Sequence, residues 1–521
     1  MIRPARRSPA AVVSCVLATV LLLAACAAPP KVQTTLAEPG TVAGTPDPDA
    51  VAAGAAAGAP AGFEAYYGQL LEWTDCGSGF QCATADAPLS WQDAASGTIE
   101  VALKKAPARG NKVGSLLINP GGPGGSGVEL VEGIDRFGGR LRDGFDIVGF
   151  DPRGVGRSTR VVCLDDAGLD EYLTASYPQD EEGLEEMAQN VREFGAACAQ
   201  NTGALLGNVD TQSVARDLDM LRAVLGDPKL NYLGYSYGTD LGATYAGLFP
   251  DRVGRLVLDG AVDVTLGSDE IAEEQAVGFE NALRAYVADC QDGPNCPLGG
   301  NVDTGLRQVR AMLDDALDHP IPTSGKREVT QSLAFYGVAV TLYDEGNWAI
   351  LTEALTEVFQ EGTGDTLLYL ADFYNDRNSD GTFKSNSTEV FKAVGCLDDQ
   401  AEEDLGKMRD LAGHIEQVAP TVGSFFAYSG LSCVDWPFPP VQDAYDVSAP
   451  GAAPIVVIGT TNDPATPYKW AEGLASTLQS GVLVTYEGEG HTAYGRSNQC
   501  IAGAVENYLV DGTVPRDGLT C

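Results

Sequence analysis

Short apolar runs alternate with amphipathic segments of helical length from about residue 98 onward. Runs of four to eight aliphatic, β-branched or aromatic residues between turn-forming residues are typical of buried strands. The predicted strands are residues 98–106, 113–119, 145–151, 230–235, 254–260, 454–460 and 482–488. Residues 213–226 and 239–250 have the 3.6-residue apolar spacing of helices. Strands that alternate with helices predict a mostly parallel sheet with helices on both faces.

This alternation stops between residues 262 and 445, where helical patterns dominate before strand signals resume. We expect residues 262–445 to form a mainly helical cap inserted into the sheet domain. The core would then consist of residues 61–261 and residues 446–521.

The first 25 residues have the pattern of an export signal. Three arginines precede an apolar run, which ends in the sequence LAAC at Cys26. This ending resembles the bacterial lipobox, which implies a lipoprotein signal peptide over residues 1–25 and a lipidated Cys26 that tethers the protein to the outer face of the membrane. An ordinary signal peptide or a retained anchor helix would also export the protein, to the cell wall or beyond. Residues 26–60 are mostly Ala, Pro, Gly and Thr, which predicts a disordered spacer.

The net charge and the number of cysteines indicate which partners and which cellular compartment to expect. A formal charge of −39 argues against binding to nucleic acid. Besides Cys15 and Cys26 there are ten cysteines, and an even number in an exported chain favours disulfides over metal ligands. Pairing neighbours along the sequence predicts Cys76–Cys82, Cys163–Cys198, Cys290–Cys296, Cys396–Cys433 and Cys500–Cys521.

One serine has the surroundings of a nucleophile. Ser236 lies between Gly234 and Gly238 in a G-x-S-x-G pattern, where the predicted strand 230–235 ends and a helix begins. A sharp strand-to-helix turn leaves no room for side chains beside the nucleophile, which explains both glycines. The pattern alone is weak in a chain with 62 glycines, so a base and an acid must also be found.

A serine hydroxyl needs a base to accept its proton, and the chain has only three histidines. His319 and His414 lie in the predicted insertion. His491 follows the predicted strand 482–488 in a loop, where a base can reach the nucleophile, so we assign the base to His491.

The third member should be a carboxylate that orients the imidazole. Asp463 follows the strand before that of His491, which gives the order Ser, Asp, His found in α/β-hydrolases. Asp259, Glu487 and Glu489 are the competing carboxylates.

The developing oxyanion needs backbone N–H donors. One normally comes from the residue after the nucleophile, here Tyr237. The glycine-rich loop INPGGPGGSG should supply the other from Gly121 or Gly122, and we assign it to Gly122. The same loop contains a formal G-x-G-x-x-G, but its two prolines and the export signal argue against dinucleotide binding. The chain has no zinc or P-loop motif, so the predicted chemistry uses no cofactor or metal.

Taken together, INPGGPGGSG, FDIVGFDPRGVGRST, YLGYSYGT, NDPATPY and EGHTAYG resemble the exported actinobacterial tripeptidyl aminopeptidases, which are relatives of proline iminopeptidases. The resemblance extends from about residue 70 to the C-terminus. It implies an α/β-hydrolase fold with a helical cap, and a serine exopeptidase that forms an acyl-enzyme and releases short peptides, such as tripeptides, from free N-termini. Carboxylesterases also occur in this group, so that activity is the first alternative. A binding lipoprotein without turnover is the alternative of another class.

Relatives that trim N-termini use cap carboxylates to hold the substrate ammonium. The acidic cluster at the start of the predicted cap contains Asp269, Glu270, Glu273 and Glu274. The resemblance therefore points to Glu270, Glu273 and Glu274 as candidates for this contact. A solvated helix face is the simpler interpretation for any one of them.

Overall fold

The computed structural model describes residues 54, 56, 58–399, 404–441 and 444–521. Residues 1–53 lie outside this part, and with them Cys26, the predicted signal peptide and most of the predicted spacer. Within the described residues, no helix is long and apolar enough to cross a membrane.

A ten-stranded sheet forms the centre of the described residues, with strand order β1-β2-β3-β5-β4-β6-β7-β8-β9-β10. The pairs β1/β2, β2/β3 and β3/β5 are antiparallel, whereas every pair from β5/β4 to β9/β10 is parallel. The strands are β1 (Thr74–Asp75), β2 (Gln81–Ser90), β3 (Asp93–Ala106), β4 (Gly114–Asn119), β5 (Phe145–Phe150), β6 (Leu230–Tyr235), β7 (Val253–Asp259), β8 (Ile455–Asn462), β9 (Gly481–Glu489) and β10 (Leu519–Thr520). This arrangement confirms the predicted α/β-hydrolase fold.

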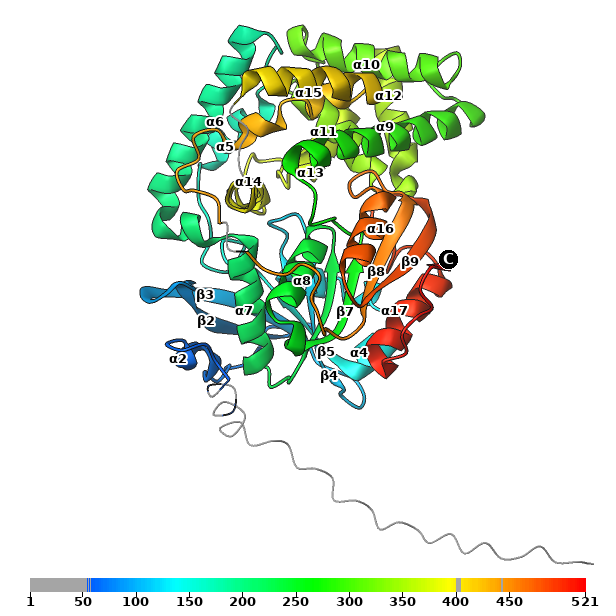
Figure 1. The fold of residues 1–521 in the computed structure, drawn as a ribbon. Coiled ribbons are helices and arrows are strands. Elements are labelled where there is room, and N and C mark those ends of the chain that lie inside the picture. Colours follow the sequence, from blue (N-terminus) through cyan, green and yellow to red (C-terminus); the bar gives the residue numbers. More distant parts are fainter. Residues whose placement is uncertain (1–53, 55, 57, 400–403, 442–443) are drawn as a thin grey trace, which may run out of the picture. The chain divides into compact units, whose positions relative to one another are not determined.

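Alternate side chains of the central strands enter two different cores, because successive residues of a strand point to opposite faces. In β4, Leu117 belongs to one core, which the apolar faces of α7 and α8 also build. Leu116 and Ile118 belong to the other, which α3, α4 and α17 cover. Figure 1 shows helices on both sides of the sheet. The flanking helices are α2 (Glu64–Tyr67), α3 (Gly127–Glu132), α4 (Gly139–Gly144), α7 (Thr211–Val224), α8 (Tyr237–Leu248), α16 (Tyr468–Thr477) and α17 (Gln499–Asp511).

The region between β7 and β8 is helical, as the sequence pattern predicts, and much of it packs around a core of its own. Its helices are α9 (Ser268–Asp292), α10 (Val302–Asp318), α11 (Gln331–Leu342), α12 (Trp348–Thr356), α13 (Asp365–Tyr374), α14 (Ser387–Asp398) and α15 (Leu405–Val418). Two earlier helices, α5 (Asp166–Thr174) and α6 (Glu181–Thr202), lie beside this cap in Figure 1. Asp170 of α5 pairs with Arg327 at 3.2 Å and with Arg377 at 2.7 Å. The segment between β5 and α7 therefore also contributes to the cap.

All five predicted disulfides form: Cys76–Cys82, Cys163–Cys198, Cys290–Cys296, Cys396–Cys433 and Cys500–Cys521. Disulfides form and persist in oxidising compartments. These pairs are therefore those of an exported protein.

Candidate active site

The turn between β6 and α8 holds Ser236 in a backbone conformation of positive φ, with φ 55° and ψ −128°. A non-glycine residue adopts such a conformation only where its surroundings impose it. A Cβ on Gly234 would lie 2.3 Å from the Gly238 carbonyl oxygen, and a Cβ on Gly238 would lie 2.8 Å from Asn119 Oδ1. Both glycines are therefore required for the tight turn that exposes the serine.

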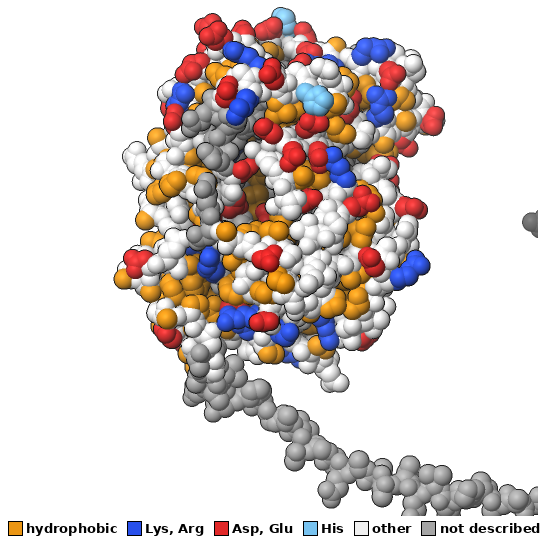
Figure 2. All heavy atoms as spheres, in the orientation of Figure 1, with side chains coloured by type: hydrophobic (Ala, Val, Ile, Leu, Met, Phe, Trp, Pro, Cys, Tyr) orange, Lys and Arg blue, Asp and Glu red, His pale blue; other side chains and the backbone are white. Residues whose placement is uncertain are grey.

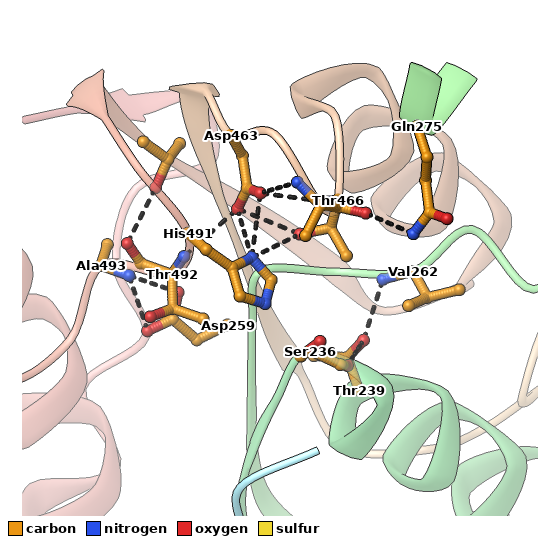
Figure 3. A network of polar contacts seen from close by, with 12 residues as sticks. Ser236, Thr239, Asp259, Val262, Gln275, Asp463, Thr466, His491, Thr492 and Ala493 are labelled. Atoms are coloured by element: carbon orange, nitrogen blue, oxygen red, sulfur yellow. Dashed lines mark hydrogen bonds and ion pairs between the residues drawn. The ribbon is translucent and has the colours of Figure 1, made fainter. Parts of the chain in front are cut away.

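His491 and Asp463 meet above this turn (Figure 3). The imidazole Nδ1 of His491 is 2.9 Å from both carboxylate oxygens of Asp463. Asp463 follows β8 and His491 follows β9, so neighbouring parallel strands end side by side and deliver the pair. In Figure 3 the imidazole lies over Ser236, with its other nitrogen pointing away from Asp463. This is the arrangement that a serine, a base and its orienting acid require.

The Asp463 carboxylate is fixed by the turn that follows it. Its Oδ1 accepts the backbone N–H groups of Ala465 and Thr466, each at 2.9 Å. The Thr466 hydroxyl donates to Asp463 Oδ2 at 3.0 Å and lies 3.3 Å from His491 Nδ1. Sequence reasoning missed Thr466. The signal was the segment D-P-A-T, because an Asp at the start of such a turn commonly accepts the N–H groups two and three residues later.

The competing carboxylates have other partners. Asp259 accepts the backbone N–H groups of Ala493 at 2.9 Å and Tyr494 at 2.7 Å, and so supports the loop after His491. Burial raises the pKa of Asp259 to about 7. Glu489 accepts the Asn462 amide at 2.8 Å, and Glu487 is exposed. The structure thus brings only Asp463, of these four, to the imidazole.

One predicted oxyanion donor, Tyr237, directly follows Ser236, and the glycine loop that should supply the other packs against the same turn. Tyr237 is the first residue of α8, and the first N–H groups of a helix have no acceptor within the helix. Gly121 lies against the turn, since a Cβ there would be 2.8 Å from Ser236 Cβ and 3.1 Å from the Tyr237 nitrogen. The Gly121 N–H donates to Asn119 Oδ1 at 2.8 Å. Within the described residues, the Gly122 N–H donates to no protein acceptor, and its role as the second oxyanion donor stays a prediction.

The predicted ammonium-binding glutamates all lie on α9, and each has a partner in the protein. Glu270 accepts the Gly267 N–H at 3.1 Å as part of the helix cap. Glu273 pairs with His414 at 3.2 Å. Glu274 pairs with Lys469 at 2.6 Å and also accepts the Trp470 indole N–H.

Two other carboxyls are linked to the elements that surround the nucleophile. Asp240 is in the first turn of α8, and Asp398 ends the cap helix α14. Asp398 accepts the Thr211 N–H at 2.8 Å and the Thr211 hydroxyl at 2.5 Å, and that hydroxyl lies 2.6 Å from the Tyr237 hydroxyl. The Asp398 side chain is exposed, but desolvation by the protein around it raises its pKa well above the usual range, and the charge of Asp240 raises it further. Sequence reasoning missed both groups because they are far apart in the chain.

Phe391 lies two turns before Asp398 in α14, and therefore on the same face of this helix. Phe391 is 53% exposed, although in Figure 1 its helix lies between the other cap helices and the sheet domain. Ser387, at the start of α14, touches the glycine loop, because a Cβ on Gly124 would lie 2.8 Å from the Ser387 carbonyl oxygen. Figure 2 shows the surface hollowed between cap and sheet domain on this side. Among the described residues, no group of three or more His, Cys, Asp or Glu is arranged to hold a metal ion.

The α/β-hydrolase sheet, the turn at Ser236 and the Asp463–His491 pair define the class of protein as a serine hydrolase. Comparison with known proteins gives the family. The sequence profile described as "TAP-like protein" matches residues 419–521. Serine protease Hip1 of Mycobacterium tuberculosis (strain ATCC 25618 / H37Rv) is 39% identical over 87% of this chain and 91% of its own. The chain therefore belongs to the TAP-like serine hydrolases.

Two further relatives are similar over most of their length. Carboxylesterase B of the same Mycobacterium tuberculosis strain is 36% identical, covering 85% of this chain and 86% of its own. The tripeptidyl aminopeptidase of Streptomyces lividans is 28% identical, covering 87% and 86%. Among solved structures, the proline iminopeptidase of Mycobacterium smegmatis is 16% identical, covers 82% of this chain and 97% of its own, and has a TM-score of 0.36.

Proposed function

We propose that this protein is an exported serine exopeptidase that releases short peptides, such as tripeptides, from free N-termini. The observation that carries the proposal is the His491 Nδ1–Asp463 contact at 2.9 Å above Ser236, whose backbone is held at φ 55°. Relatives named serine protease and tripeptidyl aminopeptidase support peptide-bond hydrolysis.

In the proposed mechanism, Ser236 attacks the carbonyl carbon of the scissile bond while His491 accepts its proton. Asp463 keeps the Nδ1 proton facing away from the serine and stabilises the imidazolium that forms. The N–H groups of Tyr237 and Gly122 receive the oxyanion. His491 then returns the proton to the leaving amine, and water attacks the acyl-enzyme by the reverse sequence of proton transfers.

The substrate ammonium needs carboxylates in the space between cap and sheet. Glu270, Glu273 and Glu274 remain our first proposal for this contact, and each would have to exchange its present partner. Asp240 and Asp398 form a second set, supported by the link from Asp398 through Thr211 to the Tyr237 hydroxyl. Charge-neutral variants, with Glu changed to Gln or Asp to Asn, separate the two sets. Neutralising the set that binds the ammonium should raise KM for a free tripeptide and leave hydrolysis of an N-blocked ester unaltered.

Carboxylesterase activity is the second candidate, because the relative named Carboxylesterase B is 36% identical to this chain. The deciding experiment uses residues 27–521 and three chromogenic substrates: a tripeptide anilide with a free N-terminus, its N-blocked form and a simple aryl ester. Ser236→Ala is the control for contaminating hydrolases. Cleavage of the free tripeptide anilide, lost in the variant and weak on the blocked form, supports the exopeptidase. Ester cleavage without either anilide supports the esterase.

We also propose that Cys26 carries lipid and tethers the mature protein to the outer face of the membrane, with residues 26–60 as the spacer. The support is the LAAC sequence after the apolar run. In an expressing bacterium fed an alkyne-tagged fatty acid, the full chain should incorporate the tag and sediment with membranes. Incorporation of the alkyne-tagged fatty acid into a Cys26→Ser variant would contradict the assignment.

A further inference from the structure

The cap touches the catalytic histidine directly. Tyr343 follows the cap helix α11, and its carbonyl oxygen accepts the backbone N–H of His491 at 2.8 Å. The approach at the preceding residue is equally close, because a Cβ on Gly490 would lie 2.6 Å from the Tyr343 oxygen. Gly490 has φ 86°, a conformation that favours glycine. The loop that carries the base is therefore pressed against the cap.

The Tyr343 side chain also contacts the imidazole. The two rings meet edge to face, with centroids 5.3 Å apart and an interplanar angle of 88°. This is a favoured geometry for aromatic pairs. On another side, the imidazole edge faces the backbone of Gly260, where a Cβ would lie 3.2 Å from His491 Cε1.

Tyr343 is itself held by the cap. Its ring lies 5.9 Å from that of Phe279 on α9. Burial raises the pKa of Tyr343 well above its usual range, and the neighbouring Tyr374 adds to the rise. The Tyr374 ring in turn stacks on Tyr336 at 5.2 Å. The ring that meets His491 is thus anchored in an aromatic cluster of the cap.

Asp463 binds the imidazole only at Nδ1, and one bonded atom leaves the ring free to tilt about that contact. The direction of Nε2 toward Ser236 must then come from the groups that pack on the ring. An error of about 1 Å in the position of a catalytic group can cost on the order of 100-fold in rate.

We infer that Tyr343 is a positioning residue: the cap sets the orientation of His491 through the Tyr343 carbonyl and ring, and the base is correctly aimed only when the cap is in place. This inference rests on the proposed function of Ser236 and His491. On this inference the cap orients the catalytic base as well as lining the space that the substrate occupies.

The test compares Tyr343→Ala, which removes the ring, with Tyr343→Phe, which keeps the ring edge. Phe335→Ala is the matched control, because Phe335 belongs to the same aromatic cluster and stacks on Phe425 at 4.1 Å. The readouts are the rate constant for labelling of Ser236 by a small fluorophosphonate, and kcat and KM for the best of the three chromogenic substrates. Labelling depends on the nucleophile and base but needs no contact with peptide subsites.

The expected result is a loss of about tenfold or more in both labelling and kcat for Tyr343→Ala, with KM little changed. Tyr343→Phe should keep most of the wild-type rate, and Phe335→Ala should lose thermal stability but keep its labelling rate. If Tyr343→Ala does not fold, Tyr343→Leu fills the volume without an aromatic edge and should show the same loss. Wild-type labelling rates in a folded Ala or Leu variant, or an equal loss in Phe335→Ala, would overturn the inference. Absence of labelling in the wild-type protein would instead overturn the proposed function.

Discussion

Replacing Gly121 by alanine should damage catalysis far more than it damages the fold. The new Cβ would lie 2.5 Å from the Tyr235 carbonyl oxygen, 2.8 Å from Ser236 Cβ and 3.1 Å from the Tyr237 nitrogen. The first two distances are shorter than real Cβ contacts, so either the glycine loop or the nucleophile turn must shift by several tenths of an ångström. Both segments carry the predicted oxyanion donors.

The magnitude follows from two contributions. Gly121 has φ 94°, and an alanine in the left-handed region costs about 1–2 kcal/mol of stability. Loss of one correctly placed oxyanion donor lowers kcat by about 100- to 1000-fold. We therefore expect a folded Gly121→Ala variant with a modestly lower melting temperature and a kcat at least 100-fold lower on the cleaved substrate.

Gly77→Ala is the matched control for backbone strain. Gly77 has φ 88°, and an added Cβ there meets no atom within 4 Å. Its melting temperature should fall by a similar amount while its kcat stays at the wild-type value. Near-normal kcat in a folded Gly121→Ala variant would refute the placement of the oxyanion site beside this glycine.

Three further changes test other parts of the structure. Asp463→Asn should lower kcat by about 10⁴-fold without unfolding the protein, because an amide cannot stabilise the imidazolium of His491; steady-state kinetics measure this, and a loss below tenfold would point to another acid. Arg153→Met should lower the free energy of unfolding in urea by about 3–5 kcal/mol. The guanidinium of the buried Arg153 donates to the buried Asp217 carboxylate at 2.6 and 2.7 Å. The substitution leaves that carboxylate without its cation. A loss of stability below about 1 kcal/mol would show that water reaches the carboxylate in the variant. Burial raises the pKa of Asp240 to about 6, so the folded state binds its proton more tightly than the unfolded state does. Its contribution to stability is complete below about pH 4 and is lost as the pH rises through about 6. Asp240→Asn should therefore flatten the pH dependence of the free energy of unfolding over that range. An unchanged pH dependence in the variant would contradict the raised pKa.

The parallel strands β4 to β9 were predictable because most of their residues are apolar, whereas the two-residue strand β10 was not predicted. The segments GSLLIN of β4 and LNYLGY of β6 are buried nearly throughout, as strands covered on both faces must be. The strand β2 was not predicted, since its sequence QCATADAPLS mixes polar with small residues and only three of its ten residues are buried. Its position comes from antiparallel pairing with β3, which no local pattern records.

The sequence by itself determined the nucleophile turn, the order of Ser236, Asp463 and His491, and the pairing of the cysteines. Each of these depends on local sterics or on neighbours in the chain: a tight turn requires glycines, and short loops bring nearby cysteines together. Only the tertiary structure decided which carboxylate reaches the imidazole: Asp259 ends β7 and Asp463 follows the neighbouring β8, and the fold brings Asp463 to the ring and Asp259 to the backbone of the loop after it. It also decided that the cap residue Tyr343 packs on the base, since that contact joins segments almost 150 residues apart that carry no shared pattern.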